Sequence, residues 1–421
     1  MGGARGELLG EGPAGEILAP AHGVRPNLAR FLLLMFQVGL VGAALGVTRT
    51  VLPLLAESEF GIASKTATLS FVVAFGLAKA PLNFGSGALA DRFGRKRVLI
   101  AGWLLGLPFP LLLAFAQSWT WVIAAMVLLG LQQGLCWSTT IFMKVDVAGP
   151  RRRGFAIGIN EFTGYVGMAV VTHGSGAVAA SLGPRVFPFL LGEALVVGGL
   201  VTALRFVDDT SHFVEAERNG VLASAVQAVR TGTFAAVCQA GLTTKIADAA
   251  AWGLLPIFLA EGGLAVETIG LLAAAYPGSW GLMQPLTGWL SDRFGRKPLI
   301  VAGMLVQALG LVVLARGTTI SGWLSGITLL GSGTALVYPV LLAAAADVAA
   351  PADRASSIGH YRLWRDLGFV VGGVVAGALA DAVGIAGSLQ LLALFSLVSG
   401  GLVAVLYRAS DQGPPETSPH P

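Results

Sequence analysis

Long apolar runs separated by short polar segments follow one another along nearly the whole chain. Each run approaches or exceeds the roughly 20 residues that a helix needs to cross a bilayer, and the runs lack the strict alternation of a half-buried strand. We count twelve, at 28–55, 66–90, 97–116, 119–145, 154–181, 185–206, 232–260, 266–291, 298–315, 319–346, 355–382 and 386–408. The pattern predicts an all-α polytopic membrane protein with twelve transmembrane helices.

Polar segments divide the predicted helices into two groups of six. The longest polar stretch between runs, 208–231, is interpreted as a cytoplasmic linker between bundles at 28–207 and 232–408. Residues 1–27 are rich in Gly, Pro and Ala and predict a disordered tail, because the first apolar run is too long for a signal peptide. Residues 409–421 predict a second disordered tail.

Composition excludes several classes of protein. Hydrophobic residues make up 55% of the chain and charged residues 12%, against roughly 25% charged in soluble domains, and the mean hydropathy is +0.75. These values exclude a soluble enzyme, a disordered protein and a nucleic-acid binder. Cys136 and Cys238 lie in apolar runs and are interpreted as small buried hydrophobic residues. No nucleophile–base or metal-ligand pattern emerges, so neither an enzyme nor a cofactor is expected.

Basic residues predict the orientation in the membrane. Of the 27 Lys and Arg residues, 17 fall in the tails and loops on one side of the predicted spans, and only Lys65, Arg185 and Arg316 fall on the other. Loops rich in Lys and Arg face the cytoplasm. Both termini are therefore expected in the cytoplasm, with the protein in the plasma (inner) membrane.

The chain contains an internal repeat with an offset of 201 residues. GALADRFGRK at 87–96 returns as GWLSDRFGRK at 288–297, and a second block that begins at Asp146 returns from Asp347. Two matches at one offset indicate a duplicated six-helix unit, which builds a cavity between its halves and transports by rocking them. The repeated loops contain Gly87, Asp91, Arg92, Gly94, Arg95 and Lys96, and Gly288, Asp292, Arg293, Gly295, Arg296 and Lys297.

On these loops the chain resembles the major facilitator superfamily over residues 28–408, and we identify it as a member. The resemblance implies secondary transport of a small solute, usually driven by a proton or solute gradient, by a monomer whose repeated loops act as gates. Asp91 and Asp292 are expected to cap neighbouring helix N-termini, and the basic residues to bridge the bundles in one state. Plain positive-inside anchoring is the alternative, but it explains neither the Asp nor the Gly spacing.

Two positions depart from the antiporters of this family. Gly130 stands where an Arg often precedes the Gln133-Gly134 pair of span 4, and Tyr165 stands where drug antiporters often carry Pro. The direction of transport therefore stays open.

Polar and charged residues inside the spans are the candidate site, because a charge at mid-membrane costs at least ~2.5 kcal/mol. The candidates on spans that the resemblance places around a central cavity are Arg49, Lys79, Asn160, Glu161, Lys245, Asp248, Tyr361, Arg362, Arg365 and Asp366. Lys245 and Asp248 either face the cavity or neutralise each other, and Arg365 and Asp366 are expected to point to different faces. Lys144 and Asp146 are interpreted as interfacial.

The repeat also pairs candidates across the halves. Glu161 aligns with Arg362, so we expect these two side chains to pair across the cavity until a proton reaches Glu161. Trp137 and Tyr338 are repeat partners and candidate substrate contacts. Pro53 and Pro256 are expected hinges near the outer ends of spans 1 and 7.

The intramembrane charges count five positive and three negative, which favours an anionic solute. The sequence therefore predicts a proton-coupled secondary transporter of a small solute, with an organic anion favoured. Its expected partners are the solute, protons and the lipid bilayer, and no nucleic acid is expected to bind. An efflux antiporter for neutral or cationic compounds, with Glu161 as acidic anchor, is one alternative. A non-transporting receptor or scaffold with the same fold is the other.

Overall fold

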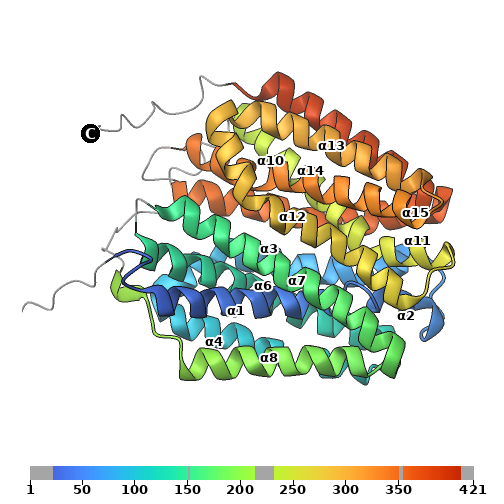
Figure 1. Cartoon of the computed structure of the whole chain (residues 1–421), viewed down its shortest axis with the longest axis horizontal. Helices are drawn as coiled ribbons and strands as arrows, with labels where there is room; N and C mark the ends of the chain where they lie inside the picture. Colours follow the sequence, from blue (N-terminus) through green and yellow to red (C-terminus); the bar gives the residue numbers. More distant parts are fainter. Residues whose placement is uncertain (1–21, 150–151, 214–231, 350–353, 409–421) are drawn as a thin grey trace, which may run out of the picture.

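The computed structural model describes residues 22–149, 152–213, 232–349 and 354–408. Within these ranges the chain forms helices and connecting turns and no strand. The helices lie roughly parallel in two stacked groups, one from each half of the sequence (Figure 1). Residues 1–21, 214–231 and 409–421, which make up most of the predicted linker and the predicted tails, lie outside the described residues.

The N-terminal bundle contains eight α-helices and one short 3₁₀ turn. They are α1 (Leu28–Gly46), α2 (Leu52–Ser58), α3 (Lys65–Phe93), α4 (Arg95–Gly106), α5 (Pro108–Ala114), α6 (Trp119–Ala148), α7 (Arg153–Leu182), α8 (Phe187–Arg205) and η2 (Ser211–Phe213). The helix α1 with α2, and α4 with α5, each correspond to one predicted span.

The C-terminal bundle repeats this order. Its helices are α10 (Gly232–Gly253), α11 (Leu255–Glu261), α12 (Val266–Phe294), α13 (Arg296–Arg316), α14 (Ile320–Asp347) and α15 (Arg354–Leu406). The last is two helices, because Gly384 breaks it with φ +76° and ψ 166°, a backbone conformation that favours glycine.

The predicted all-α fold of twelve spans in two bundles is confirmed. Nine described helices are long and apolar enough to cross a membrane, and α10 with α11, bent by 42°, makes a tenth. The break in α15 divides one of these helices into two spans, which makes eleven. The twelfth is α12, which is not among those counted but holds the same place in the C-terminal half as α3 in the N-terminal half. Its 29 residues include Pro277 and Pro285, which lower its apolar character.

Spans 1 and 7 are each broken near the proline where a hinge was expected, so the predicted spans 28–55 and 232–260 each contain two helices. The first loses regular helix between Gly46 and Leu52, and the second at Leu254. Pro53 and Pro256 lie in the first turn of the helix that follows each break. Proline is tolerated there because the first N–H groups of a helix have no internal partner.

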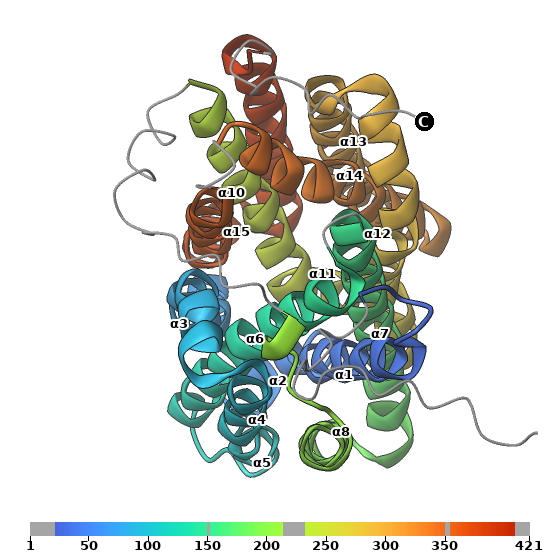
Figure 2. The same cartoon turned by 90° about the vertical axis from the view of Figure 1, so that its left-hand side faces the viewer.

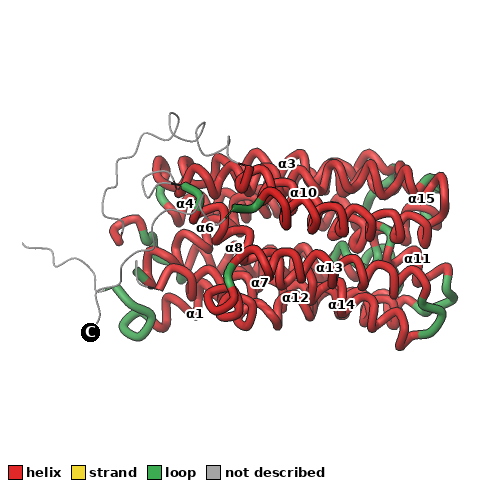
Figure 3. The backbone as a smooth tube through the Cα atoms, turned by 90° about the horizontal axis from the view of Figure 1, so that it is seen from above, coloured by secondary structure: helices red, strands yellow, loops and turns green. Residues whose placement is uncertain are grey.

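The bundles meet along two pairs of helices, α3 with α15 and α7 with α12 (Figure 2). We call the end of the molecule that carries the loops 91–96 and 292–297 the basic end, and the opposite end the far end. Seen from above, the helices of both bundles run lengthwise beside one another (Figure 3).

Candidate functional site

A small cavity lies at the centre, between the bundles. Its lining includes eight of the predicted site residues, namely Arg49, Lys79, Trp137, Lys245, Asp248, Tyr338, Arg362 and Arg365. Leu45, Asn83, Tyr165, Met168 and Phe369 complete it. The free space is about 10 Å³, room for roughly one water molecule, so a solute fits only if the bundles separate.

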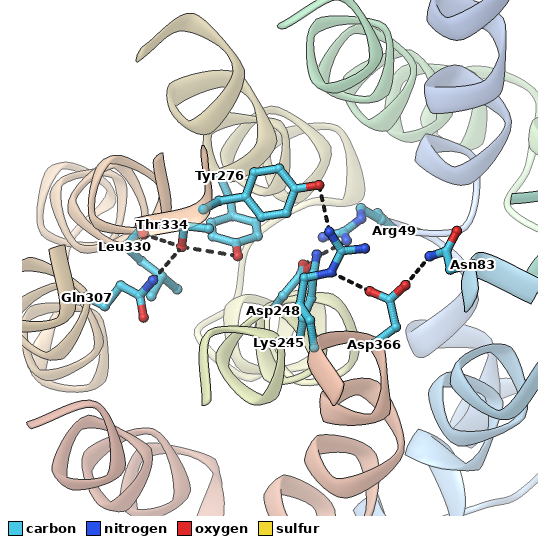
Figure 4. A network of polar contacts seen from close by, with 11 residues as sticks. Arg49, Asn83, Lys245, Asp248, Tyr276, Gln307, Leu330, Thr334 and Asp366 are labelled. Carbon is cyan, nitrogen blue, oxygen red and sulfur yellow. Dashed lines mark hydrogen bonds and ion pairs between the residues drawn. The ribbon is translucent and has the colours of Figure 1, made fainter. Parts of the chain in front are cut away.

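Asp248 joins the two bundles next to this cavity (Figure 4). Its Oδ1 is 2.8 Å from a terminal nitrogen of Arg49, and its Oδ2 is 2.7 Å from Lys245 Nζ. All three side chains are at most 4% exposed. Lys245 and Asp248 thus neutralise each other and also face the cavity, so the two alternatives of the sequence analysis are both realised. The break between α1 and α2 places Arg49 here.

A second acidic centre is built around Asp366. Its Oδ1 is 2.7 Å from Arg365 Nε, and its Oδ2 accepts a hydrogen bond from Asn83 of the other bundle. A terminal nitrogen of Arg365 donates to Tyr338 Oη at 2.8 Å. The expectation that Arg365 and Asp366 point to different faces was wrong, because the long arginine side chain reaches back to its neighbour.

Two of the five basic side chains that line the cavity have no acidic partner in the described part of the chain. Among the described residues, neither Lys79 nor Arg362 forms an ion pair, although they are only 8% and 6% exposed. Lys79 Nζ lies 5.4 Å from the ring centre of Phe75 and 5.6 Å from that of Phe369. Aromatic faces attract a cation but supply no counter-charge. These two cavity side chains are therefore buried without a paired carboxylate.

Glu161 lies behind the cavity wall rather than in it. Trp137 Nε1 donates to Glu161 Oε1 at 2.8 Å, and the buried Oε2 has no hydrogen-bond partner within the described part of the chain. The expected ion pair with Arg362 does not form there. Tyr361 also lies outside the lining, buried in the C-terminal bundle beside Gly241.

The interpretation of Lys144 as an interfacial residue was wrong. This residue is completely buried rather than interfacial, and its Nζ donates to Asn160 Oδ1 at 2.7 Å. Asn160 and Glu161 lie about two turns into α7, and Trp137 and Lys144 lie on one side of α6, so the four form a polar cluster inside the N-terminal bundle. Lys144 lies two residues before Asp146 near the end of a predicted span, where charged residues usually lie at the membrane surface. Nothing in the sequence indicated that Lys144 is buried instead.

The repeated loops form the same structure twice. Arg95 contacts Asp91 at 2.5 Å and Asp146 at 3.2 Å, and Arg296 contacts Asp292 at 2.7 Å and Asp347 at 3.1 Å. Each arginine therefore ties a loop to the end of a helix in its own bundle. Within the described residues these loops make no ion pair between bundles, so the expected bridging is absent from this conformation.

Glycine is required at only one of its two positions in each loop. Gly94 and Gly295 have φ of +89° and +85°, which other residues rarely adopt. A side chain at Gly87 would meet only the tip of Phe142, and one at Gly288 would meet nothing within 4 Å. The spacing of the motif thus reflects one turn conformation rather than two close contacts.

The anion that caps a helix at the basic end is Asp209, not Asp91. Asp209 Oδ2 accepts from Lys96 N in the first turn of α4 at 2.9 Å, and Oδ1 accepts from Ser211 N at 2.7 Å. Burial alone would raise the pKa of Asp209, but the hydrogen bonds from the Ser211 hydroxyl and from the backbone of Ser211 and Lys96 outweigh it and lower the pKa. Asp91 and Asp292 instead bind the arginine four residues on.

Five lining residues were not among the predicted site residues, namely Leu45, Asn83, Tyr165, Met168 and Phe369. Asn83 was detectable, since it is a polar residue one turn after Lys79 in an apolar run. It matters because it links Asp366 of one bundle to Ser138 of the other, whose Oγ donates to Asn83 Oδ1 at 2.8 Å. The apolar residues carried no signal that distinguishes them from other core positions.

Comparison with known proteins gives a consistent result. A family model described as Major Facilitator Superfamily matches residues 34–244 and again 234–421. A bacterial homologue of the human lysosomal transporter Spinster, solved in an inward-facing and occupied conformation, superposes with a TM-score of 0.75. It shares 14% identity, and the match covers 94% of this chain and all of that one, so it supports the fold.

Sequence relatives include transporters of several kinds. Multidrug resistance protein 2 of Bacillus subtilis is 30% identical over 127 residues, only 30% of this chain and about a third (32%) of that protein. A probable 4-methylmuconolactone transporter of Cupriavidus pinatubonensis is 26% identical over 302 residues, 67% of each chain. An uncharacterised MFS-type transporter of Bacillus subtilis, YddS, is 25% identical and covers 89% of this chain.

Proposed function

Because the chain belongs to the major facilitator superfamily, we propose that it is a proton-coupled secondary active transporter that moves a small organic anion. It does so by alternating access of a central cavity to the two sides of the membrane. The basic end faces the cytoplasm in this proposal, since Lys and Arg are concentrated there.

The excess of basic charge around the cavity carries the proposal. Five basic side chains line it, against Asp248 in the lining and Asp366 beside it. Both carboxylates already have cationic partners, which leaves Lys79 and Arg362 uncompensated. A buried charge without a counter-charge is costly, and an anionic solute between these two side chains would remove that cost.

Transport in proteoliposomes tests the anion. We expect a pool of organic acids, and not a pool of lipophilic cations, to drive proton flux reported by a pH-sensitive dye inside the vesicles. Lys79→Gln and Arg362→Gln are expected to lower anion transport at least tenfold, the change that ~1.4 kcal/mol of lost binding produces. Arg316→Gln, an exposed arginine at the far end, is the matched control. If both cavity variants transport as well as the control, the anion proposal is wrong.

Efflux of a neutral or cationic compound is the second candidate. It is favoured by the buried and unpartnered oxygen of Glu161 and by the relative named as a multidrug resistance protein. In that case we expect the cation pool to drive proton flux and Glu161→Gln to abolish this flux. Lys79→Gln and Arg362→Gln are expected to leave it intact.

A further inference from the structure

Asp381 ties the two bundles together at the far end. This residue lies on α15, in the C-terminal bundle, and its carboxylate accepts three hydrogen bonds from the start of α3 in the N-terminal bundle. Lys65 N donates to Oδ1 at 2.5 Å, and Thr66 N and Ser64 Oγ donate to Oδ2 at 3.0 and 2.8 Å. A carboxylate of one bundle thus caps a helix of the other.

The electrostatics of this contact favour closure. The first N–H groups of a helix lack internal partners and carry the positive end of the helix dipole, which an anion stabilises. Lys65 adds a second connection, since its Nζ lies 3.7 Å from Glu57 of its own bundle and 3.7 Å from Glu261 of the other. The start of α3 therefore contacts the opposite bundle through backbone and side chain.

Glycines bring the helices close enough for the cap. A methyl group at Gly377, one turn before Asp381, would lie 2.6 Å from Thr66 Cα. Its repeat partner is Gly176 on α7. A methyl group at Gly176 would lie 2.9 Å from Gly270 Cα, at the α7–α12 crossing. Both crossings are thus tight at the far end.

The carboxylate cap exists at only one crossing. The repeat partner of Asp381 is Ala180, and Ala265 stands where the other half has Ser64. The α7–α12 crossing therefore lacks this cap within the described residues, whereas the α3–α15 crossing has a carboxylate and three donors.

The cap is suited to opening repeatedly. Asp381 is exposed to solvent, so water replaces its donors at little cost when the helices part. Next to it lies a hollow of about 330 Å³ between α2, α3 and α11, whose lining includes Lys65 and Thr68.

We propose that Asp381 and the N-terminus of α3, residues 64–66, form a latch that holds the far end closed and opens once in each transport cycle. The inference rests on the proposed alternating access. It assigns to the far end a contact that has no counterpart in the other half of the repeat.

A distance measurement tests the latch without transport. Spin labels at Gln117→Cys and Thr318→Cys, exposed loop residues at the far end of the two bundles, report its opening in the full chain in nanodiscs. Asp381→Ala is expected to raise the ratio of open to closed molecules about fivefold, the effect of losing one helix cap. The matched control Glu267→Ala, which removes an acidic residue at the start of α12, is expected to change nothing.

A cross-link tests the same contact from the other direction. Oxidised Ser64→Cys/Asp381→Cys is expected to abolish the open population, and reductant to restore it. Equal distance distributions in Asp381→Ala, Glu267→Ala and the parent would overturn the latch, as would an open population that survives in the cross-linked protein. If the parent opens and closes but transports neither solute pool, the proposed function fails while the latch stands.

Discussion

The Asp248 carboxylate is the group whose removal we expect to damage this protein most. Asp248→Asn keeps the shape of the side chain but removes the charge that Arg49 and Lys245 share at 2.8 and 2.7 Å. The two cations, 4% and 3% exposed, are then left buried beside each other. The variant also breaks the ion pair that joins the bundles beside the cavity.

The geometry sets the size of the effect. At an effective dielectric constant of about 20, charges 2.8 Å apart attract by about 6 kcal/mol. Most of this offsets the cost of taking the charges out of water, but removal of one partner of a buried pair still costs about 3–5 kcal/mol. Lys245→Met leaves Arg49 and Asp248 as a one-to-one pair, so we expect it to cost only about 1 kcal/mol.

Unfolding of the purified protein in detergent measures both variants. Asp208→Asn is the control, since Asp208 is 63% exposed in its ion pair with Arg30, and its loss is expected to change the free energy of unfolding by less than about 1 kcal/mol. The reasoning is refuted if Asp248→Asn is as stable as Asp208→Asn, or if Lys245→Met is the more damaging of the two cavity variants.

Three further outcomes are expected. Glu161→Gln should abolish gradient-driven transport while solute binding persists, and intact gradient-driven transport would exclude Glu161 as the proton carrier. Arg95→Ala, which loses the contacts with two carboxylates, should lower the free energy of unfolding by about 2 kcal/mol, whereas thermal melts of Arg92→Ala should match the parent. Asp209→Asn should cost about 1 kcal/mol at pH 7. The pKa of Asp209 is lowered in the folded state, so its contribution to the free energy of unfolding is complete above about pH 4 and is lost as the pH falls through the folded-state pKa. If the parent and the variant differ in free energy of unfolding by the same amount at pH 7 and pH 3, this assignment is contradicted.

The twelve spans and the duplication could be predicted from the sequence, because they depend on local properties. A bilayer accepts only segments that satisfy their backbone hydrogen bonds internally and present apolar side chains, so hydropathy locates the helices. Two identical DRFGRK blocks at one offset then relate the halves. Eight of the twelve predicted site residues line the cavity for the same reason, since charges inside spans avoid lipid.

The partners of those charges were decided only by the tertiary structure. The sequence could not show that Asp248 serves two cations, that Lys144 is buried against Asn160, or that Trp137 separates Glu161 from the cavity. A partner depends on how each helix is rotated and which helix lies against it. These helices are apolar around most of their circumference, so periodicity does not reveal the rotation.

Contacts between the halves were the least accessible to sequence reasoning. Asp381 reaches Lys65 across 316 residues, and no repeat or motif connects them. Within a bundle, the duplication shows a contact twice where both halves keep its residues, as with the arginines of the two loops. The Asp381 contact between the bundles is made once, because its repeat partner is Ala180, and only the assembled fold specifies it.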